Sequence, residues 1–591
     1  MKALFWFFYI LITLLSAAVL EFNRNTLAGW VLFVLLACAF PYVFHRFLKN
    51  RKLKAAGWFG YIALFALILF ITRPPVKRVP AVSYSNPRTT DIIHTDKGDV
   101  SGVYTQDGTV EIYAGIPYAK PPVGELRWRP PVEADAWEGV KACDTFAPMS
   151  MQVTNSPFYD SLARIVGFHD YHISLKDNWR EAVSEDSLYL NVWKPAGAQS
   201  KLPVLVYIHG GSLQTGQPWY SDYSGEQFAR DGVITVNMGY RLGVFGFFAD
   251  ETLLKEDGTT GNYGLLDQIM ALQWVKRNIE AFGGDPDNIT LAGESAGAVC
   301  VDALCVSPLA KGLFRRAILE SSTLASAEPP HSFRLFDEAI ASGRSLMERY
   351  GASSVDDLRK LDAAEIVGEM STQHHVTVDG YVLPDTPYNL RRRGIHNEEA
   401  ILHGYNAEES GPFLLFNHAK LDDYEERIRS FYKDKADDIL ALYPAATDEE
   451  ADKNWAAIYG AEFFNYSHYC LNRLAQANDI PSYEYYFSKS NGRLSSWHSG
   501  EMIYAFGMIP ADSKLFDESD RDLSRIMHGC WTAFVKTGVP ASSDLPEFPE
   551  NSGSDKLMEF GDNIGLIDEP YLRLYAIMDE IHGFQADPVS E

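Results

Sequence analysis

Residues 289–297 read Ile-Thr-Leu-Ala-Gly-Glu-Ser-Ala-Gly, and this stretch decides the fold of the chain. Its first four residues are apolar or β-branched, which is typical of a short buried strand. The next five have the pattern G-x-S-x-G, and a run suited to a helix continues to Val306. A serine on a sharp turn between a strand and a helix projects its hydroxyl above the sheet. We therefore predict that Ser295 is a nucleophile.

Similar units of strand and helix surround this turn. Residues 204–208 and 233–236 are dense in apolar and β-branched side chains, as buried parallel strands are. Residues 265–282 have helical spacing and stop at Gly283-Gly284. Strands that alternate with helices predict an α/β architecture with a mainly parallel sheet, whose functional sites lie at the carboxyl ends of the strands.

A glycine-rich segment follows the strand 204–208 and reads His209-Gly210-Gly211-Ser212. Glycines let backbone N–H groups approach a substrate oxygen closely, and an attacked carbonyl needs such donors for its developing negative charge. Taken alone, the segment is also compatible with an ordinary glycine turn. Its place ahead of the serine turn favours an oxyanion hole.

Further motifs extend the pattern over almost the whole of residues 91–580, and the chain resembles the type B carboxylesterase/lipase family, which includes cholinesterases and bacterial carboxylesterases. The resemblance implies an α/β-hydrolase fold, with a mainly parallel central sheet flanked by helices. The motifs that carry it are Ala114-Gly-Ile-Pro-Tyr-Ala119, Pro121-Pro-Val-Gly124, Arg127-Trp-Arg-Pro-Pro131, Ser184-Glu-Asp-Ser-Leu-Tyr-Leu-Asn-Val-Trp193, Tyr240-Arg-Leu-Gly-Val-Phe-Gly246, Gly261-Asn-Tyr-Gly-Leu-Leu-Asp267 and Phe282-Gly-Gly-Asp-Pro286.

The resemblance also implies the other members of a catalytic triad. The family's acid is a Glu in a G-x-N-x-x-E segment, and residues 404–409 match it with Glu409, while Glu408 is the competing neighbour. The family's base is a His followed by Glu and then by Phe-Gly, which identifies His498, ahead of Glu501 and of residues 506–507. The order Ser, Glu, His is that of α/β-hydrolases.

The implied activity is hydrolysis of a small carboxylic ester through an acyl-enzyme, with no cofactor. His498 would take the proton of Ser295, Glu409 would orient the imidazole, and the backbone N–H groups of Gly211, Ser212 and Ala296 would hold the oxyanion. Neither a metal-ligand spacing nor a phosphate-binding loop stands out in the sequence. Two alternatives remain open: an adhesion protein that has lost catalysis, and an acyltransferase, thioesterase or lipase with the same triad.

The sequence departs from the family at several positions. Ser212 stands where the third oxyanion residue is usually Gly or Ala. Ser187 replaces a cysteine of the family, and residues 148–152 contain no partner cysteine, so we expect no disulfide there and a freer loop over residues 150–183. The spacing of Cys300 and Cys305 on one predicted helix is too long for a bridge. We expect buried free thiols.

Length and charge set limits on function. The 591 residues carry a net charge of −26, which argues against nucleic-acid binding. Residues 1–80 alone sum to +9 and the remainder to −35. The chain thus has a basic head on an acidic body. With the motifs above, its length indicates one large catalytic domain over residues 91–591.

The basic head contains three apolar stretches, residues 3–20, 27–44 and 55–72, each 18 residues long without Asp, Glu, Lys or Arg. About 17 to 25 apolar residues span a bilayer, so we predict three transmembrane helices. One such stretch alone could be a buried core helix, and the first could be a cleaved signal peptide. Prolines in residues 73–90 predict a stiff linker to the body.

The distribution of Lys and Arg predicts the orientation of these helices. Residues 45–54 contain five basic side chains, whereas the loop before them contains only Arg24. Positively charged loops stay in the cytoplasm, so three spans place the catalytic body on the extracytoplasmic face, periplasmic or extracellular. Cleavage of the first stretch would leave the body on the same side.

Overall fold

The computed structural model describes residues 2–23, 25–73, 77–78, 81–82, 87–153, 180–198, 201–327, 333–368, 375–491, 494–550, 555–587 and 589. The chain divides into two compact units, residues 1–80 with 154–183, and residues 81–153 with 184–591. Parts of the predicted linker 73–90 and most of the loop 150–183 lie outside the described residues. The boundaries predicted at residues 72 and 90 stay predictions.

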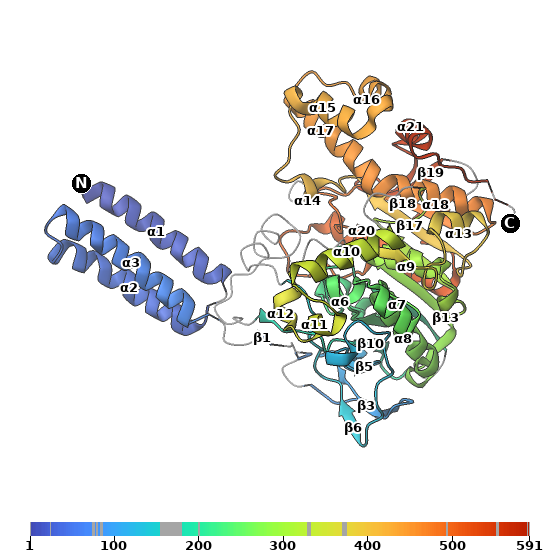
Figure 1. The fold of residues 1–591 in the computed structure, drawn as a ribbon, viewed down its shortest axis with the longest axis horizontal. Coiled ribbons are helices and arrows are strands. Elements are labelled where there is room, and N and C mark those ends of the chain that lie inside the picture. Colours follow the sequence, from blue (N-terminus) through green and yellow to red (C-terminus); the bar gives the residue numbers. More distant parts are fainter. Residues whose placement is uncertain are drawn as a thin grey trace. The chain divides into compact units, whose positions relative to one another are not determined.

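The first unit contains three helices at the predicted apolar stretches: α1 (Lys2–Phe22), α2 (Leu27–Arg46) and α3 (Arg51–Ile71) (Figure 1). Among the described residues, α2 and α3 are long and apolar enough to cross a membrane by length and composition, and the first apolar helix is described over Phe5–Glu21. The short strands β1 (Lys77–Arg78) and β8 (Arg180–Glu181) pair in parallel in the same unit. Two membrane-spanning candidates are therefore found in the described residues, and the third span stays a prediction.

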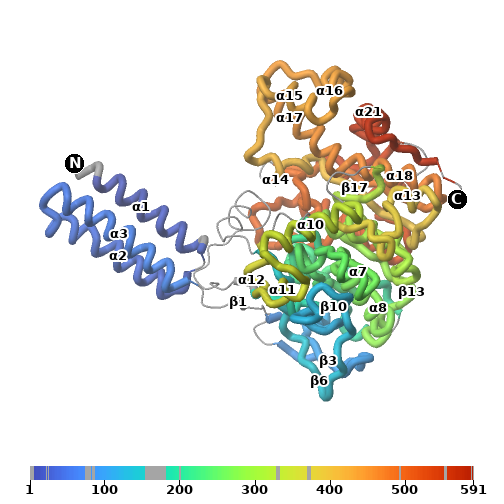
Figure 2. The backbone as a smooth tube through the Cα atoms, in the orientation of Figure 1, coloured from blue at the N-terminus to red at the C-terminus, as the bar shows by residue number. Residues whose placement is uncertain are grey.

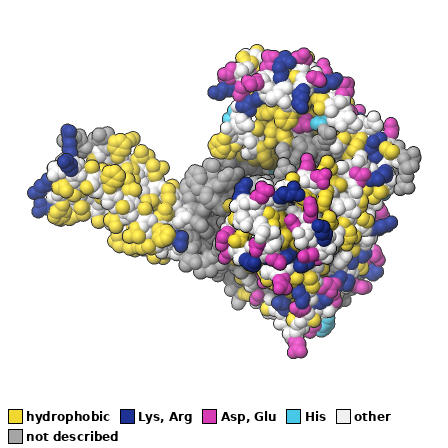
Figure 3. Space-filling view, in the orientation of Figure 1, with side chains coloured by type: hydrophobic (Ala, Val, Ile, Leu, Met, Phe, Trp, Pro, Cys, Tyr) yellow, Lys and Arg dark blue, Asp and Glu magenta, His cyan; other side chains and the backbone are white. Residues whose placement is uncertain are grey.

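On the face drawn in Figure 3, apolar side chains cover most of the surface of these helices. Phe7, Leu14, Leu35 and Phe59 are all more than half exposed, at 62%, 64%, 61% and 76%. A helix that is apolar on all sides favours a lipid environment over water.

The body is built on one large sheet. Among the described residues it has 11 strands in the order β20-β19-β18-β17-β14-β13-β11-β12-β10-β5-β4. The central strands from β12 to β19 are parallel, and antiparallel strands close both edges. The strands are β4 (Val103–Tyr104), β5 (Val110–Pro117), β10 (Tyr189–Pro195), β11 (Leu202–Ile208), β12 (Ile234–Met238), β13 (Gly284–Glu294), β14 (Arg316–Glu320), β17 (Ile401–Asn406), β18 (Ser482–Phe487), β19 (Lys556–Phe560) and β20 (Gly565–Asp568).

Helices cover both faces of this sheet. On β11, Val204 and Val206 pack into one apolar core and Leu205 into a second core on the other face. Such alternation follows from the two-residue period of a strand. Helix α9 contributes to the first core and α20 to the second. The helices of the body are α5 (Glu226–Arg230), α6 (Gly243–Phe247), α7 (Glu251–Asp257), α8 (Tyr263–Asn278), α9 (Ala296–Val306), α10 (Phe336–Arg349), α11 (Val355–Arg359), α12 (Ala363–Ile366), α13 (Pro387–Arg392), α14 (Gly411–Leu414), α15 (Leu421–Tyr432), α16 (Ala436–Leu442), α17 (Asp448–Gly460), α18 (Tyr466–Ala477), α19 (Met502–Ala505), α20 (Glu518–Thr537) and α21 (Leu572–His582).

Several short elements complete the body. Helices α15 to α17 form a group at one end, drawn in orange in Figure 2. A π-helical turn, Ala461–Asn465, joins α17 to α18. The short strands are β2 (Ile93–His94), β3 (Asp99–Ser101), β6 (Val140–Ala142), β7 (Met149–Ser150), β9 (Val183–Ser184), β15 (Phe333–Leu335) and β16 (Val376–Val378).

The predicted elements are confirmed, with small shifts in their ends. Helix α9 has the predicted bounds, whereas β13 extends the predicted strand 289–292 in both directions. The predicted helix 265–282 is α8 followed by a 3₁₀ turn, Ile279–Phe282. All six cysteines are free, and those of the body are buried, as expected.

Candidate active site

Ser295 lies on the turn between β13 and α9, at the carboxyl end of a central strand. Its φ of 55° and ψ of −125° are unusual for a residue with a side chain, and such strain costs about 1–3 kcal/mol. The turn also needs glycine on both sides of Ser295. A Cβ at Gly297 would lie 2.1 Å from the carbonyl oxygen of Ile208, and a Cβ at Gly293 would lie 2.5 Å from the carbonyl carbon of Gly297.

The three side chains predicted as a triad form one chain of hydrogen bonds. Nε2 of His498 lies 2.8 Å from Oγ of Ser295, and its Nδ1 lies 2.6 Å from Oε2 of Glu409. The backbone N–H of Asn406 donates to the other oxygen of Glu409 at 2.7 Å. Glu409 is 1% exposed and His498 is 8% exposed, so these bonds are shielded from water. It is Glu409, and not the exposed Glu408, that contacts His498.

Negative charge surrounds His498. Burial alone lowers the pKa of its imidazole, but the charges of Glu409 and Glu294 outweigh burial and raise the pKa to about 9. Burial and the same two carboxylates raise the pKa of Glu501 to about 8. The site thus stabilises an imidazolium, the species formed when a histidine takes a proton from serine.

The glycine-rich segment turns back beside Ser295. Gly211 and Ser212 both have positive φ, 107° and 56°. A Cβ at Gly210 would lie 3.1 Å from Cβ of Ser295, which places the segment against the serine. Among the described residues, no backbone carbonyl accepts a hydrogen bond from the N–H of Gly211 or Ser212. These donors are therefore available to another acceptor.

Two aromatic rings that were not predicted from the sequence pack on the side of His498. The ring centroids of Phe464 and Phe413 lie 4.7 Å and 5.3 Å from that of His498. Phe464 belongs to the π-helical turn Ala461–Asn465, a local departure that is frequent at functional sites. Phe413 is 45% exposed, so an apolar wall leads from His498 to the surface.

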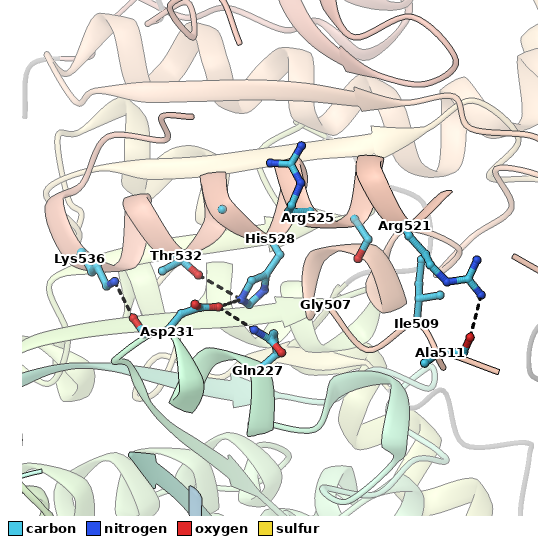
Figure 4. A pocket seen from close by; sticks show the side chains of 12 residues that line it. Gln227, Asp231, Gly507, Ile509, Ala511, Arg521, Arg525, His528, Thr532 and Lys536 are labelled. Carbon is cyan, nitrogen blue, oxygen red and sulfur yellow. Dashed lines mark hydrogen bonds and ion pairs between the residues drawn. The ribbon is translucent and has the colours of Figure 1, made fainter. Parts of the chain in front are cut away.

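A separate cavity of about 500 Å³ lies between α5 and α20 (Figure 4). Its basic side chains already have partners. His528 bonds the carboxylate of Asp231 at 2.9 Å, Lys536 donates to the carbonyl of Asp231 at 2.6 Å, and the guanidinium of Arg521 donates to loop carbonyls such as that of Ser513 at 3.1 Å. Arg525 pairs with an aspartate outside the cavity. None of the triad side chains lines this cavity.

Within the described residues, no group of three or more His, Cys, Asp and Glu side chains is arranged to hold a metal ion.

Comparison with known proteins decides the family. The family model described as "Carboxylesterase family" matches residues 89–569. The chain belongs to this family. A carboxylesterase of Geobacillus stearothermophilus has a structure that matches with a TM-score of 0.69 at 30% identity, covering 83% of this chain and 100% of that one. The central sheet and this likeness confirm the predicted α/β-hydrolase fold.

Curated relatives agree with the family. The fumonisin B1 esterase of Sphingopyxis macrogoltabida is 32% identical over 499 residues, which is 80% of this chain and 86% of that protein. Carboxylesterase 1C of Rattus norvegicus is 31% identical over 516 residues, 81% of this chain and 91% of that protein. An acetylcholinesterase of Leptinotarsa decemlineata is 30% identical over 496 residues, 74% of this chain and 76% of that protein. This carboxylesterase is accordingly a carboxylic ester hydrolase.

Ser187, where the resemblance implied a cysteine in relatives, makes a polar contact with Ser150. Oγ of Ser150 lies 2.9 Å from Oγ of Ser187 and 2.6 Å from the carbonyl oxygen of Tyr240. The contact between these two serines is a hydrogen bond and not a covalent bond. The loop 150–183 was expected to be freer, and its residues 154–179 lie outside the described residues, so this expectation stays a prediction.

Two residues beside the predicted triad were not predicted from the sequence. Glu294 and Ser499 are direct neighbours of Ser295 and His498 in the chain, and both are hydrogen-bonded to each other. A carboxylate next to a nucleophile was the one signal available in the sequence. The partner that it contacts lies 205 residues away, which no local pattern reveals.

Proposed function

We propose that this carboxylesterase is a membrane-anchored serine hydrolase that cleaves esters with the triad Ser295, His498 and Glu409. The observation that supports the triad is the unbroken chain of hydrogen bonds from the hydroxyl through the imidazole to the buried carboxylate, at 2.8 Å and 2.6 Å. This is the arrangement in which a base activates a weak nucleophile and a third group orients the base.

The proposed reaction has two stages. His498 takes the proton of Ser295 while Oγ attacks the ester carbonyl, and the tetrahedral oxyanion accepts hydrogen bonds from the N–H groups of Gly211, Ser212 and Ala296. His498 then gives its proton to the departing alcohol, which leaves an acyl-enzyme. A water molecule, deprotonated by the same imidazole, attacks the acyl group and releases the acid. Because only backbone N–H groups are required, Ser212 can stand in the place of Gly or Ala.

The rings of Phe413 and Phe464 favour a substrate with an apolar group, since this group can pack on them when the ester carbonyl reaches Ser295. Aromatic rings contribute large apolar contact areas to such a site. The proposed substrate is therefore a small carboxylic ester with an apolar acyl or alcohol group.

The membrane anchor rests on the composition of α1 to α3 and on their apolar outer surface. We propose that these helices span the membrane three times and place the body on the extracytoplasmic face, since the basic loop 45–54 favours the cytoplasm. A reporter fused after Pro80 checks the orientation. A signal from the cytoplasm alone contradicts the proposed orientation.

Labelling with a fluorophosphonate tests the catalytic proposal. The wild-type protein should be modified at Ser295 and should hydrolyse p-nitrophenyl esters, whereas Ser295→Ala should do neither. An adhesion homologue would resist the probe. A panel of esters, thioesters and amides of different chain lengths distinguishes an esterase from a thioesterase or a lipase, and product analysis with added alcohols reveals an acyltransferase. Full ester hydrolysis by Ser295→Ala would contradict the proposal.

A further inference from the structure

Ser499 directly follows the proposed base and has an unusual backbone. Its φ is 68°, in the left-handed region that favours glycine, and the next residue, Gly500, is a glycine without such a φ. A side chain is therefore held at the strained position rather than at its unstrained neighbour. Strain of this kind persists where the surroundings impose it and gathers at functional sites.

The hydroxyl of Ser499 has a specific partner. Its Oγ donates a hydrogen bond of 2.5 Å to Oε1 of Glu294, the residue before the nucleophile. Glu294 is 6% exposed. Among the described residues, Ser499 is the residue whose hydroxyl donates a hydrogen bond to the carboxylate of Glu294. Burial raises the pKa of Glu294, and the charge of His498 and the hydrogen bond from Ser499 act in the opposite direction.

The same carboxylate oxygen lies close to the reacting nitrogen. Oε1 of Glu294 is 3.4 Å from Nε2 of His498, while Oγ of Ser295 is 2.8 Å from that nitrogen. At 3.4 Å the carboxylate stabilises an imidazolium by its charge, yet it is too far away for a good hydrogen bond. If Oε1 moved closer, the Nε2–H group of the imidazolium would donate a charge-assisted hydrogen bond to Glu294. That bond would compete with proton transfer to the departing alcohol.

We propose that Ser499 is a positioning residue that holds Glu294 away from Nε2 of His498, so that this nitrogen stays available to Ser295 and to the leaving group. The inference rests on the proposed triad. The two other carboxylates near His498 are held by donors in a comparable way. Asn406 donates its backbone N–H to Glu409 at 2.7 Å, and Ser321 donates to Glu501 at 2.9 Å.

Steady-state hydrolysis of p-nitrophenyl butyrate by the full-length protein in detergent tests this role. Ser499→Ala and Ser499→Gly both remove the hydroxyl, but Gly also relieves the strained backbone and so should fold at least as well as the wild type. A lost hydrogen bond to a charged group corresponds to about 10- to 100-fold, so we expect kcat to fall by that factor in both variants. KM should change less than about twofold, because Ser499 acts through Glu294 and not on the substrate.

A second set of variants separates positioning from a merely structural role. Ser499→Thr keeps the hydroxyl and should recover most of the lost kcat. In a Glu294→Gln background, residue 294 has no carboxylate that could compete for Nε2 of His498. Ser499→Gly should then lower kcat by less than about twofold further, because the effects of two substitutions that remove one shared contact are not additive. Lys433→Gly, which also relieves a positive φ (46°), is the control for backbone strain and should keep the wild-type kcat.

Each outcome decides the inference. Wild-type kcat in Ser499→Gly, or an equal loss in the Glu294→Gln background, overturns it. Failure of the triad itself is distinguishable, since Ser295→Ala would then retain activity. If Ser295→Ala is inactive and Ser499→Gly is fully active, the proposed triad stands and the role of Ser499 falls.

Discussion

Replacing Glu409 by Gln tests the charge that the buried triad carboxylate supplies. The substitution keeps the shape of the side chain but removes the charge 2.6 Å from Nδ1 of His498. With an effective dielectric constant of about 20 and about 4 Å between the charge centres, the attraction for an imidazolium is about 4 kcal/mol. Since about 1.4 kcal/mol changes a rate tenfold, kcat should fall about 10³-fold.

The pH dependence of the same variant tests the charge of Glu409 in a second, independent way. The imidazole of His498 must be neutral to accept the serine proton, so activity rises as pH passes its pKa. Neighbouring carboxylates raise that pKa to about 9, and the acid limb of the wild-type profile should therefore lie above pH 6.5. Without the charge of Glu409 the pKa falls, so the acid limb should move to lower pH although the maximal rate is lower.

Glu408→Gln is the matched control, because it makes the same change one residue away on an exposed side chain. Both variants should be assayed with p-nitrophenyl butyrate, with circular dichroism to verify folding. Glu408→Gln should retain the wild-type rate within about threefold, as surface substitutions usually do. A Glu409→Gln rate within threefold of wild type, or a larger loss in Glu408→Gln, would refute the reasoning.

Two further predictions concern stability. Changing Ser150 and Ser187, 37 residues apart, to a cysteine pair should form a disulfide that stabilises the body by about 4 kcal/mol. Urea unfolding with and without dithiothreitol measures this stabilisation, and an identical midpoint under both conditions contradicts the prediction. Gly297→Ala should destabilise the body by about 2–3 kcal/mol and abolish activity, because its Cβ would lie 2.1 Å from the oxygen of Ile208. Gly565→Ala, where a Cβ meets no atom within 4 Å, is the control and should leave the thermal midpoint nearly unchanged.

Much of the fold could be predicted because its signals are local. Residues 289–306 contain a β-branched strand, a glycine-bounded turn and an apolar helix in sequence, and α9 has the predicted bounds. The parallel arrangement of the sheet follows from the alternation of strands and helices. The extent of β13 was underestimated because Asp285 and Pro286 are unfavourable in a strand by propensity. They lie in an irregularity of the ladder, between the pairs Leu202–Gly284 and Val204–Ile289.

The number of membrane spans in residues 1–80 is predicted from length and composition alone. Three stretches of equal length in the sequence give two candidate spans among the described residues, where the first apolar helix is described over Phe5–Glu21.

By itself, the sequence determined the turn that carries Ser295 and the order of strands and helices, and its motifs predicted which Ser, Glu and His lie together. Only the tertiary structure decided how these groups meet and what surrounds them: the burial that makes the charges near His498 strong, the rings of Phe413 and Phe464, and the contact of Ser499 with Glu294. The reason is physical. Local propensities act over a few residues, whereas burial and charge depend on side chains about 200 positions apart that only the packed sheet brings within 3 Å.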